Sequence, residues 1–179
     1  MRTLKHTVVL TAMGRVMMIL GNIALTLIIF SIIIELSKLL MTARNDTREM
    51  IEMCSGIAMI LYGYGVALEL REPLLKHLNF YPDLSTPLRR WVDERSHKYG
   101  IFFVLIGLAQ ETLVHLIMIP DRVLNTTGNE SYIFTICVFM QALVCVLLAR
   151  LSYLLVRAPR LAAADEAADI DAEATFYAD

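Results

Sequence analysis

Four apolar runs constrain this chain more than any other feature, because each is long enough to cross a lipid bilayer. They are residues 16–40, 50–70, 99–119 and 132–156. An α-helix rises about 1.5 Å per residue, so roughly 20 residues cover the ~30 Å hydrocarbon core of a membrane. Apolar residues make up 57% of the 179-residue sequence, above the roughly 45–50% of soluble domains. We therefore expect an all-α, polytopic membrane protein built as a four-transmembrane-helix antiparallel bundle.

The basic residues are sorted along the chain instead of being spread evenly. Eleven of the 16 Lys and Arg residues lie before the first run, between the second and third runs, or after the last run. They are Arg2, Lys5, Arg15, Arg71, Lys76, Arg89, Arg90, Arg95, Lys98, Arg157 and Arg160. Cytoplasmic loops of membrane proteins carry an excess of Lys and Arg. The distribution predicts that the N-terminus, the C-terminus and the loop of residues 71–98 are cytoplasmic.

A short amphipathic stretch precedes the third run. Thr86 and Pro87 have the order of an N-cap followed by proline at the first helical position. Leu88, Trp91 and Val92 then fall on one helix face, with arginines around them. We expect a short cytoplasmic interfacial helix near residues 86–95, lying on the inner leaflet. Its expected membrane-surface anchors are Arg89, Arg90, Trp91 and Arg95.

The last 19 residues differ in composition from everything before them. Residues 161–179 are rich in alanine and acidic side chains and show no recurring apolar face. Such a segment buries little surface, so we expect it to be mobile or marginally helical. Residues 1–160 then form the transmembrane domain and residues 161–179 a cytoplasmic tail. The composition of the tail resembles that of bacterial proteins, which predicts a multi-pass protein of the bacterial inner (plasma) membrane.

Small and polar residues recur at helical spacing in the first two runs. One face comprises Gly21, Ala24, Ile28, Ser31 and Glu35, and the other comprises Glu52, Gly56, Met59 and Gly63. Small residues let transmembrane helices approach closely, so we expect these faces to pack against neighbouring helices. The i,i+3 spacing of Glu35 and Lys38 predicts an ion pair near the membrane surface.

The third run carries polar residues at membrane depth. Glu111 and His115 are four residues apart and share a helix face with Gly107. Ionisable groups inside a membrane are costly, so they tend to be paired, inward-facing and functional. Threading the four runs in alternating directions brings further polar groups to comparable depth in the bundle. The resulting ion, proton or ligand candidates are Glu111, His115, Glu35, Glu52 and Gln141.

Three interpretations of Glu111 and His115 remain open from the sequence. Carboxylate and imidazole groups bind divalent transition metals, although a di-iron bundle would need Glu-x-x-His motifs on two helices. The same pair is suited to relay protons or cations. The third interpretation is structural hydrogen bonding, because an unpaired polar group in hydrocarbon costs several kcal/mol. No cofactor is predicted beyond the possible divalent metal. At the inner ends of the runs, Glu69 and Arg150 are expected to form an interhelical ion pair.

A few positions support a family resemblance. Pro87-Leu88-Arg89 precedes the third run, Ile106-Gly107 lies within it, and Asp121 follows it. Together with the four-run layout over residues 16–156, these positions resemble the phosphate-starvation-inducible E (PsiE) family of small four-span bacterial membrane proteins. The chain departs from the family in its longer charged segment, Arg90–Lys98. The resemblance implies a multi-pass inner-membrane protein and transfers no site residue.

The sequence contains none of the common catalytic motifs. It has no Walker loop, dinucleotide glycine fingerprint, HExxH, CxxC or nucleophile elbow. We therefore expect a non-enzymatic accessory or assembly component of a membrane complex or homo-oligomer, surrounded by the lipid bilayer and without a nucleic-acid partner. The alternative hypothesis is an ion, proton or divalent-metal translocator that uses Glu111 and His115.

Overall fold

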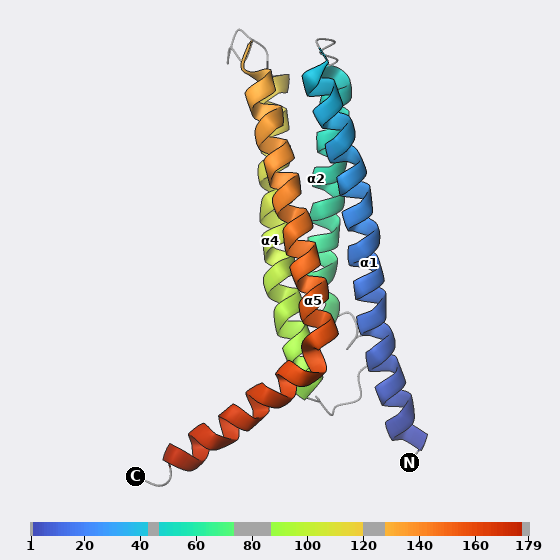
Figure 1. The fold of residues 1–179 in the computed structure, drawn as a ribbon, viewed down its shortest axis with the longest axis vertical. Helices are drawn as coiled ribbons and strands as arrows, with labels where there is room; N and C mark the ends of the chain where they lie inside the picture. Colours follow the sequence, from blue (N-terminus) through green and yellow to red (C-terminus); the bar gives the residue numbers. More distant parts are fainter. Residues whose placement is uncertain (1, 43–46, 74–86, 120–127, 177–179) are drawn as a thin grey trace.

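The computed structural model describes residues 2–42, 47–73, 87–119 and 128–176. These residues form four long helices: α1 (Arg2–Met41), α2 (Thr47–Glu69), α4 (Pro87–Met118) and α5 (Glu130–Phe176). Figure 1 shows the helices side by side in alternating directions, with both chain termini at one end. We call this the terminal end and the opposite one, where α1 ends and α2 begins, the hairpin end. The predicted antiparallel four-helix bundle is confirmed.

Each helix contains a segment that is long and apolar enough to cross a membrane. These segments are Gly14–Met41, Thr47–Glu69, Arg90–Met118 and Glu130–Arg160. They overlap all four runs expected from the sequence. The chain therefore has the architecture of a small multi-pass membrane protein.

Buried residues of α5 recur at alternating intervals of three and four. They are Phe134, Cys137, Gln141, Val144, Leu148, Leu151, Leu155 and Ala158. This heptad spacing keeps one stripe of a helix turned toward its neighbours in a bundle. The opposite side of α5 presents large apolar side chains, among them Phe139 at 71% and Val146 at 63% exposure. An outward face of this kind suits contact with lipid tails.

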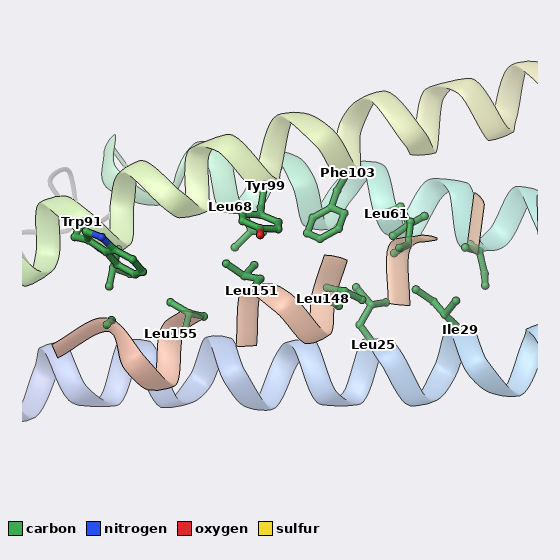
Figure 2. Close-up of a cluster of buried hydrophobic side chains, with 14 residues drawn as sticks. Leu25, Ile29, Leu61, Leu68, Trp91, Tyr99, Phe103, Leu148, Leu151 and Leu155 are labelled. Atoms are coloured by element: carbon green, nitrogen blue, oxygen red, sulfur yellow. The ribbon is translucent and has the colours of Figure 1, made fainter. Parts of the chain in front are cut away.

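The interior of the bundle draws on all four helices, as Figure 2 shows. Its labelled residues are Leu25 and Ile29 of α1, Leu61 and Leu68 of α2, Trp91, Tyr99 and Phe103 of α4, and Leu148, Leu151 and Leu155 of α5. A second apolar cluster, closer to the hairpin end, contains Leu36, Met50, Cys54, Val114, Phe134 and Cys137. Apolar packing thus runs along most of the length of the bundle.

Helices α2 and α4 touch through their backbones. A Cβ atom added to Gly65 would lie 2.7 Å from the Gly100 carbonyl oxygen, and one added to Gly107 would lie 2.8 Å from the Ala58 carbonyl oxygen. Only glycine permits such an approach, which brings transmembrane helices into close van der Waals contact. The α2–α4 pair has the most extensive contact in the bundle, and the α1–α2 pair has little. The α2–α4 seam is therefore the tightest element of the fold.

The faces expected to pack in the first two runs do not pack within the bundle. Ile28 of α1 is 48% exposed and Met59 of α2 is 71% exposed, so both expected faces turn outward. The buried stripe of α2 instead passes through Cys54, Leu61 and Gly65. The reason is the partner helix: the glycines of α4 meet the side of α2 that carries Gly65, which leaves Gly56 and Gly63 on the other side.

The expected interfacial helix is also corrected. Pro87 does begin a helix, but that helix is α4 itself, which continues without a break to Met118. Trp91 is 8% exposed and Val92 is 4% exposed, because both fill the terminal end of the interior. Trp91 is thus a core residue and not a surface anchor, with the Arg95 guanidinium 5.4 Å from the centre of its ring. Arg90 is exposed, while Thr86 and the Arg89 side chain lie outside the described residues.

The C-terminal segment is helical. Helix α5 continues to Phe176 and contains Pro159. Figure 1 shows its C-terminal part bending away from the other helices. Proline removes one backbone hydrogen bond and crowds the preceding turn, which bends helices. Residues 161–176 of the expected tail belong to this helix, and residues 177–179 lie outside the described residues.

Candidate functional site

Polar side chains gather where the α2–α4 seam approaches the hairpin end. Gln110 is fully buried, and its Nε2 donates a hydrogen bond of 2.8 Å to the Cys54 carbonyl oxygen. The Ser55 hydroxyl donates one of 2.9 Å to Oε1 of Glu111. The side chain of Glu111 is 27% exposed, so it lies at the edge of the seam. The helix contact therefore holds Glu111 in place from the α2 side.

Helix α5 completes this group. Cys54 of α2 and Cys137 of α5 belong to the same apolar cluster, and both residues are fully buried. Gln141 lies one turn further along the buried stripe of α5 and is fully buried as well. We call the set Cys54, Ser55, Gln110, Glu111, Cys137 and Gln141 the polar layer.

Several atoms of the polar layer are buried without a hydrogen-bond partner in the described part of the chain. They are Oε1 of Gln110, Oε2 of Glu111, and both Oε1 and Nε2 of Gln141. A buried polar group left unpaired costs about 1–3 kcal/mol. The unpaired amide of Gln141 therefore lowers the stability of the bundle unless a water molecule or a ligand forms hydrogen bonds with it. This makes the polar layer the strongest internal site candidate.

The structure separates the five predicted ion or ligand candidates. The Glu35 side chain is 53% exposed and pairs with Lys38 at 3.0 Å, which confirms the predicted ion pair. The Glu52 side chain is 66% exposed and pairs with Arg48 at 3.1 Å. Both carboxylates point outward because they lie on the sides of α1 and α2 that turn away from the interior. Glu35 and Glu52 therefore do not converge with Glu111 in the structure.

Glu111 and His115 do lie together. Nδ1 of His115 is 2.9 Å from the backbone carbonyl oxygen of Glu111 and 3.5 Å from its Oε1 atom. The His115 side chain is 62% exposed, so the imidazole turns outward while Glu111 stays at the seam. This pair supplies two ligands, whereas metal sites built by proteins need three or four. The described residues contain no cluster of three or more His, Cys, Asp or Glu side chains suited to a metal, and metal binding by Glu111 and His115 stays a prediction.

The ion pair that joins helices at the terminal end is not the expected one. Glu69 and Arg150 form no ion pair in the structure as described, and Arg150 is exposed. Instead, Arg71 pairs with Asp93, with side chains 15% and 11% exposed. The reason is again helix order, because the end of α2 lies against α4 and not against α5. The sequence offered one signal for the observed pair, opposite charges at the inner ends of the second and third runs.

A second polar group joins three helices nearer the terminal end. Tyr64 of α2 donates a hydrogen bond to Oδ1 of Asn22, and Nδ2 of Asn22 donates one of 3.1 Å to the Ser152 hydroxyl of α5. Asn22 is fully buried in α1. The sequence did not predict this network, although an asparagine inside an apolar run is itself a signal. The network fixes α1 against α2 and α5.

Replacing Asn22 with leucine should lower the stability of the bundle by about 1–2 kcal/mol, because the Tyr64 and Ser152 hydroxyls then lose their partner inside the membrane. The measurement is reversible unfolding in mixed micelles. The control is Ser31→Ala, at an exposed position of the same helix, which should change the stability by less than about 0.5 kcal/mol. An Asn22→Leu protein as stable as the wild type would show that the network contributes nothing.

No family model, curated protein or solved structure matches this chain.

Proposed function

We propose that this protein is a non-enzymatic, multi-pass component of the bacterial inner membrane that assembles with a second copy of itself through α2. The surface concerned is the outward face of α2. It comprises Arg48, Glu52, Gly56, Met59, Gly63 and Ala67, all of which are exposed. The observation that carries the proposal is the pair of open glycines on this face.

Gly56 and Gly63 are seven residues apart and hold the same heptad position. No atom of another described helix lies within 4 Å of the point where a Cβ of either residue would be. Each glycine lowers helix stability by about 1 kcal/mol relative to alanine. On the other side of α2, Gly65 offsets this cost through close contact with α4. A second helix against Gly56 and Gly63 would do the same, since small residues are where transmembrane helices meet.

The outward faces of the neighbouring helices differ from that of α2. On α4 and α5, large side chains such as Phe102, Leu105 and Leu143 are half or more exposed, which suits lipid tails. The span of α2 is also the least hydropathic of the four. The outward face of α2 is therefore the poorest lipid-facing surface of the bundle.

In a symmetric dimer, the outward face of α2 meets the same face of a second copy. Arg48 and Glu52 lie on the outward face of α2, with side chains 88% and 66% exposed. Copies of one chain insert in the same orientation, so a two-fold axis along the membrane normal would place the two α2 helices parallel. Each residue of this face then lies at the same depth as its own counterpart in the other copy, as a two-fold interface requires. Gly56 and Gly63 would likewise each meet their own counterpart.

The orientation in the membrane is part of the proposal. Arg15, Arg71 and Arg95 are at the terminal end, together with both termini. The excess of basic residues at cytoplasmic ends supports a cytoplasmic terminal end.

The proposal predicts that isoleucine at Gly56 and Gly63 weakens self-association at least tenfold. The measurement is energy transfer between labelled copies in liposomes as protein is diluted with lipid. The matched control is Ala142→Ile on the outward side of α5, which should associate like the wild type. Ala24→Ile probes the outward side of α1. A wild-type protein that stays monomeric at every dilution, or an association that only Ala24→Ile disrupts, would overturn the proposal.

A further inference from the structure

Arg15 is an unpaired cation at the terminal end of the bundle. It lies at the start of the membrane-crossing segment Gly14–Met41, and its side chain is partly buried. The Nε atom is fully buried and has no hydrogen-bond partner among the described residues. Arginine at such a depth normally extends its guanidinium into water or pairs it. Here one of its donors is enclosed and unused.

A second arginine, Arg71, lies two residues beyond the end of α2 and reaches the neighbouring residue of α1. A terminal nitrogen of Arg71 lies 3.5 Å from the point where a Cβ of Gly14 would be, next to Arg15 in α1. Another nitrogen of Arg71 donates to Asp93 of α4. Arg71 thus pairs with a carboxylate, whereas Nε of Arg15 has no hydrogen-bond partner among the described residues.

We propose that Arg15 and Arg71 bind the phosphate of an anionic phospholipid headgroup between α1 and α2. The planar guanidinium fork matches a phosphate group and forms paired, charge-assisted hydrogen bonds with it. The position fits as well, because both residues lie where their helices leave the hydrocarbon core. Helices α1 and α2 make little contact with each other, so a headgroup can approach between them from the bilayer. The cytoplasmic leaflet proposed for this end carries anionic lipid.

The test compares the binding of defined lipids to the purified full-length protein by native mass spectrometry. Phosphatidylglycerol is the anionic probe, phosphatidylcholine the zwitterionic reference, and inorganic phosphate the soluble source of the same group. We expect the wild-type protein to bind phosphatidylglycerol at least tenfold more tightly than phosphatidylcholine. Arg15→Gln should abolish this preference, and Arg15→Lys should retain part of it, because lysine keeps the charge and loses the fork.

The matched control is Arg160→Gln, which removes an exposed charge at the same end of the bundle and should leave the preference intact. Arg15 has no protein partner among the described residues, so Arg15→Gln is expected to fold, and its unfolding in lipid-free detergent checks this. An Arg15→Gln protein that keeps the wild-type preference would overturn the inference. Inorganic phosphate that competes fully with phosphatidylglycerol would assign the site to a soluble phosphate and overturn the lipid assignment.

Discussion

Replacing Gly65 with valine is expected to unfold the bundle along the α2–α4 seam. A single Cβ at this position would lie 2.7 Å from the Gly100 carbonyl oxygen and 2.8 Å from the Val104 backbone nitrogen. Backbone atoms of a helix do not move aside as a flexible side chain would, so the two helices must separate. Gly65→Ala should already lower stability by about 1–3 kcal/mol, the usual cost of overpacking. Valine adds two methyl groups at the same point and should cost more.

The control for Gly65 lies on the same helix. At Gly63, two residues away, no atom of another described helix is within 4 Å of the added Cβ. Gly63→Ala should therefore keep the stability of the monomer or raise it by up to about 1 kcal/mol through helix propensity. Unfolding of both variants in mixed micelles, at dilutions that exclude association, separates the two effects. Equal stabilities of Gly65→Ala and Gly63→Ala would contradict the glycine seam.

The second large effect is expected from Asp93. Its carboxylate accepts a hydrogen bond from Arg71, and the two side chains are 11% and 15% exposed. Removing one partner of a buried ion pair leaves an uncompensated charge, which costs about 3–5 kcal/mol. Asp93→Ala should therefore be among the most damaging polar substitutions in the chain. The free energy of unfolding in micelles measures it directly.

The next residue in the sequence supplies the control. Glu94 pairs with Lys98 at 2.7 Å, but both side chains are more than half exposed, at 59% and 55%. A pair of this kind contributes about 0–1 kcal/mol, so Glu94→Ala should be nearly neutral. If Asp93→Ala and Glu94→Ala lost the same stability, the buried pair would not be what joins α2 to α4 at the terminal end.

The four membrane-crossing helices can be predicted from the sequence because each span depends only on the length and the apolar character of one run. An uninterrupted apolar run and the rise of an α-helix determine a span, and neither depends on which neighbours it meets. The direction each helix faces depends on those neighbours. Helix α2 has glycines on two sides, Gly56 and Gly63 on one and Gly65 on the other. Which of these two sides is buried depends on where the glycines of α4 lie. The sequence of α2 alone does not show which side that is.

The same limit applies to the candidate site. The sequence predicts that Glu111 shares a helix face with Gly107. In the structure Glu111 lies at the α2–α4 seam, where it accepts a hydrogen bond from Ser55. The sequence places Glu52 at a depth comparable to that of Glu111, but Glu52 turns outward, because its orientation follows from the side of α2 that packs. In the sequence, Arg15 is one of the basic residues that predict which side of the membrane is cytoplasmic, and it carries no other signal. Its unpaired Nε atom becomes visible when the surrounding helices are in place.

One side of α2 packs against other helices of the bundle, and the proposed dimer requires the opposite side to pack against a second copy. Disulfide cross-linking in native membranes tests this most directly. One cysteine is introduced at Gly63 of α2 or at Leu105 of α4, both exposed, in a background where Cys145 is alanine and the remaining Cys54 and Cys137 are buried. We expect a covalent dimer of the Gly63→Cys protein and no dimer of the Leu105→Cys protein under the same oxidising conditions. Dimers from Leu105→Cys alone, or none from either position, would contradict the proposed dimer through α2.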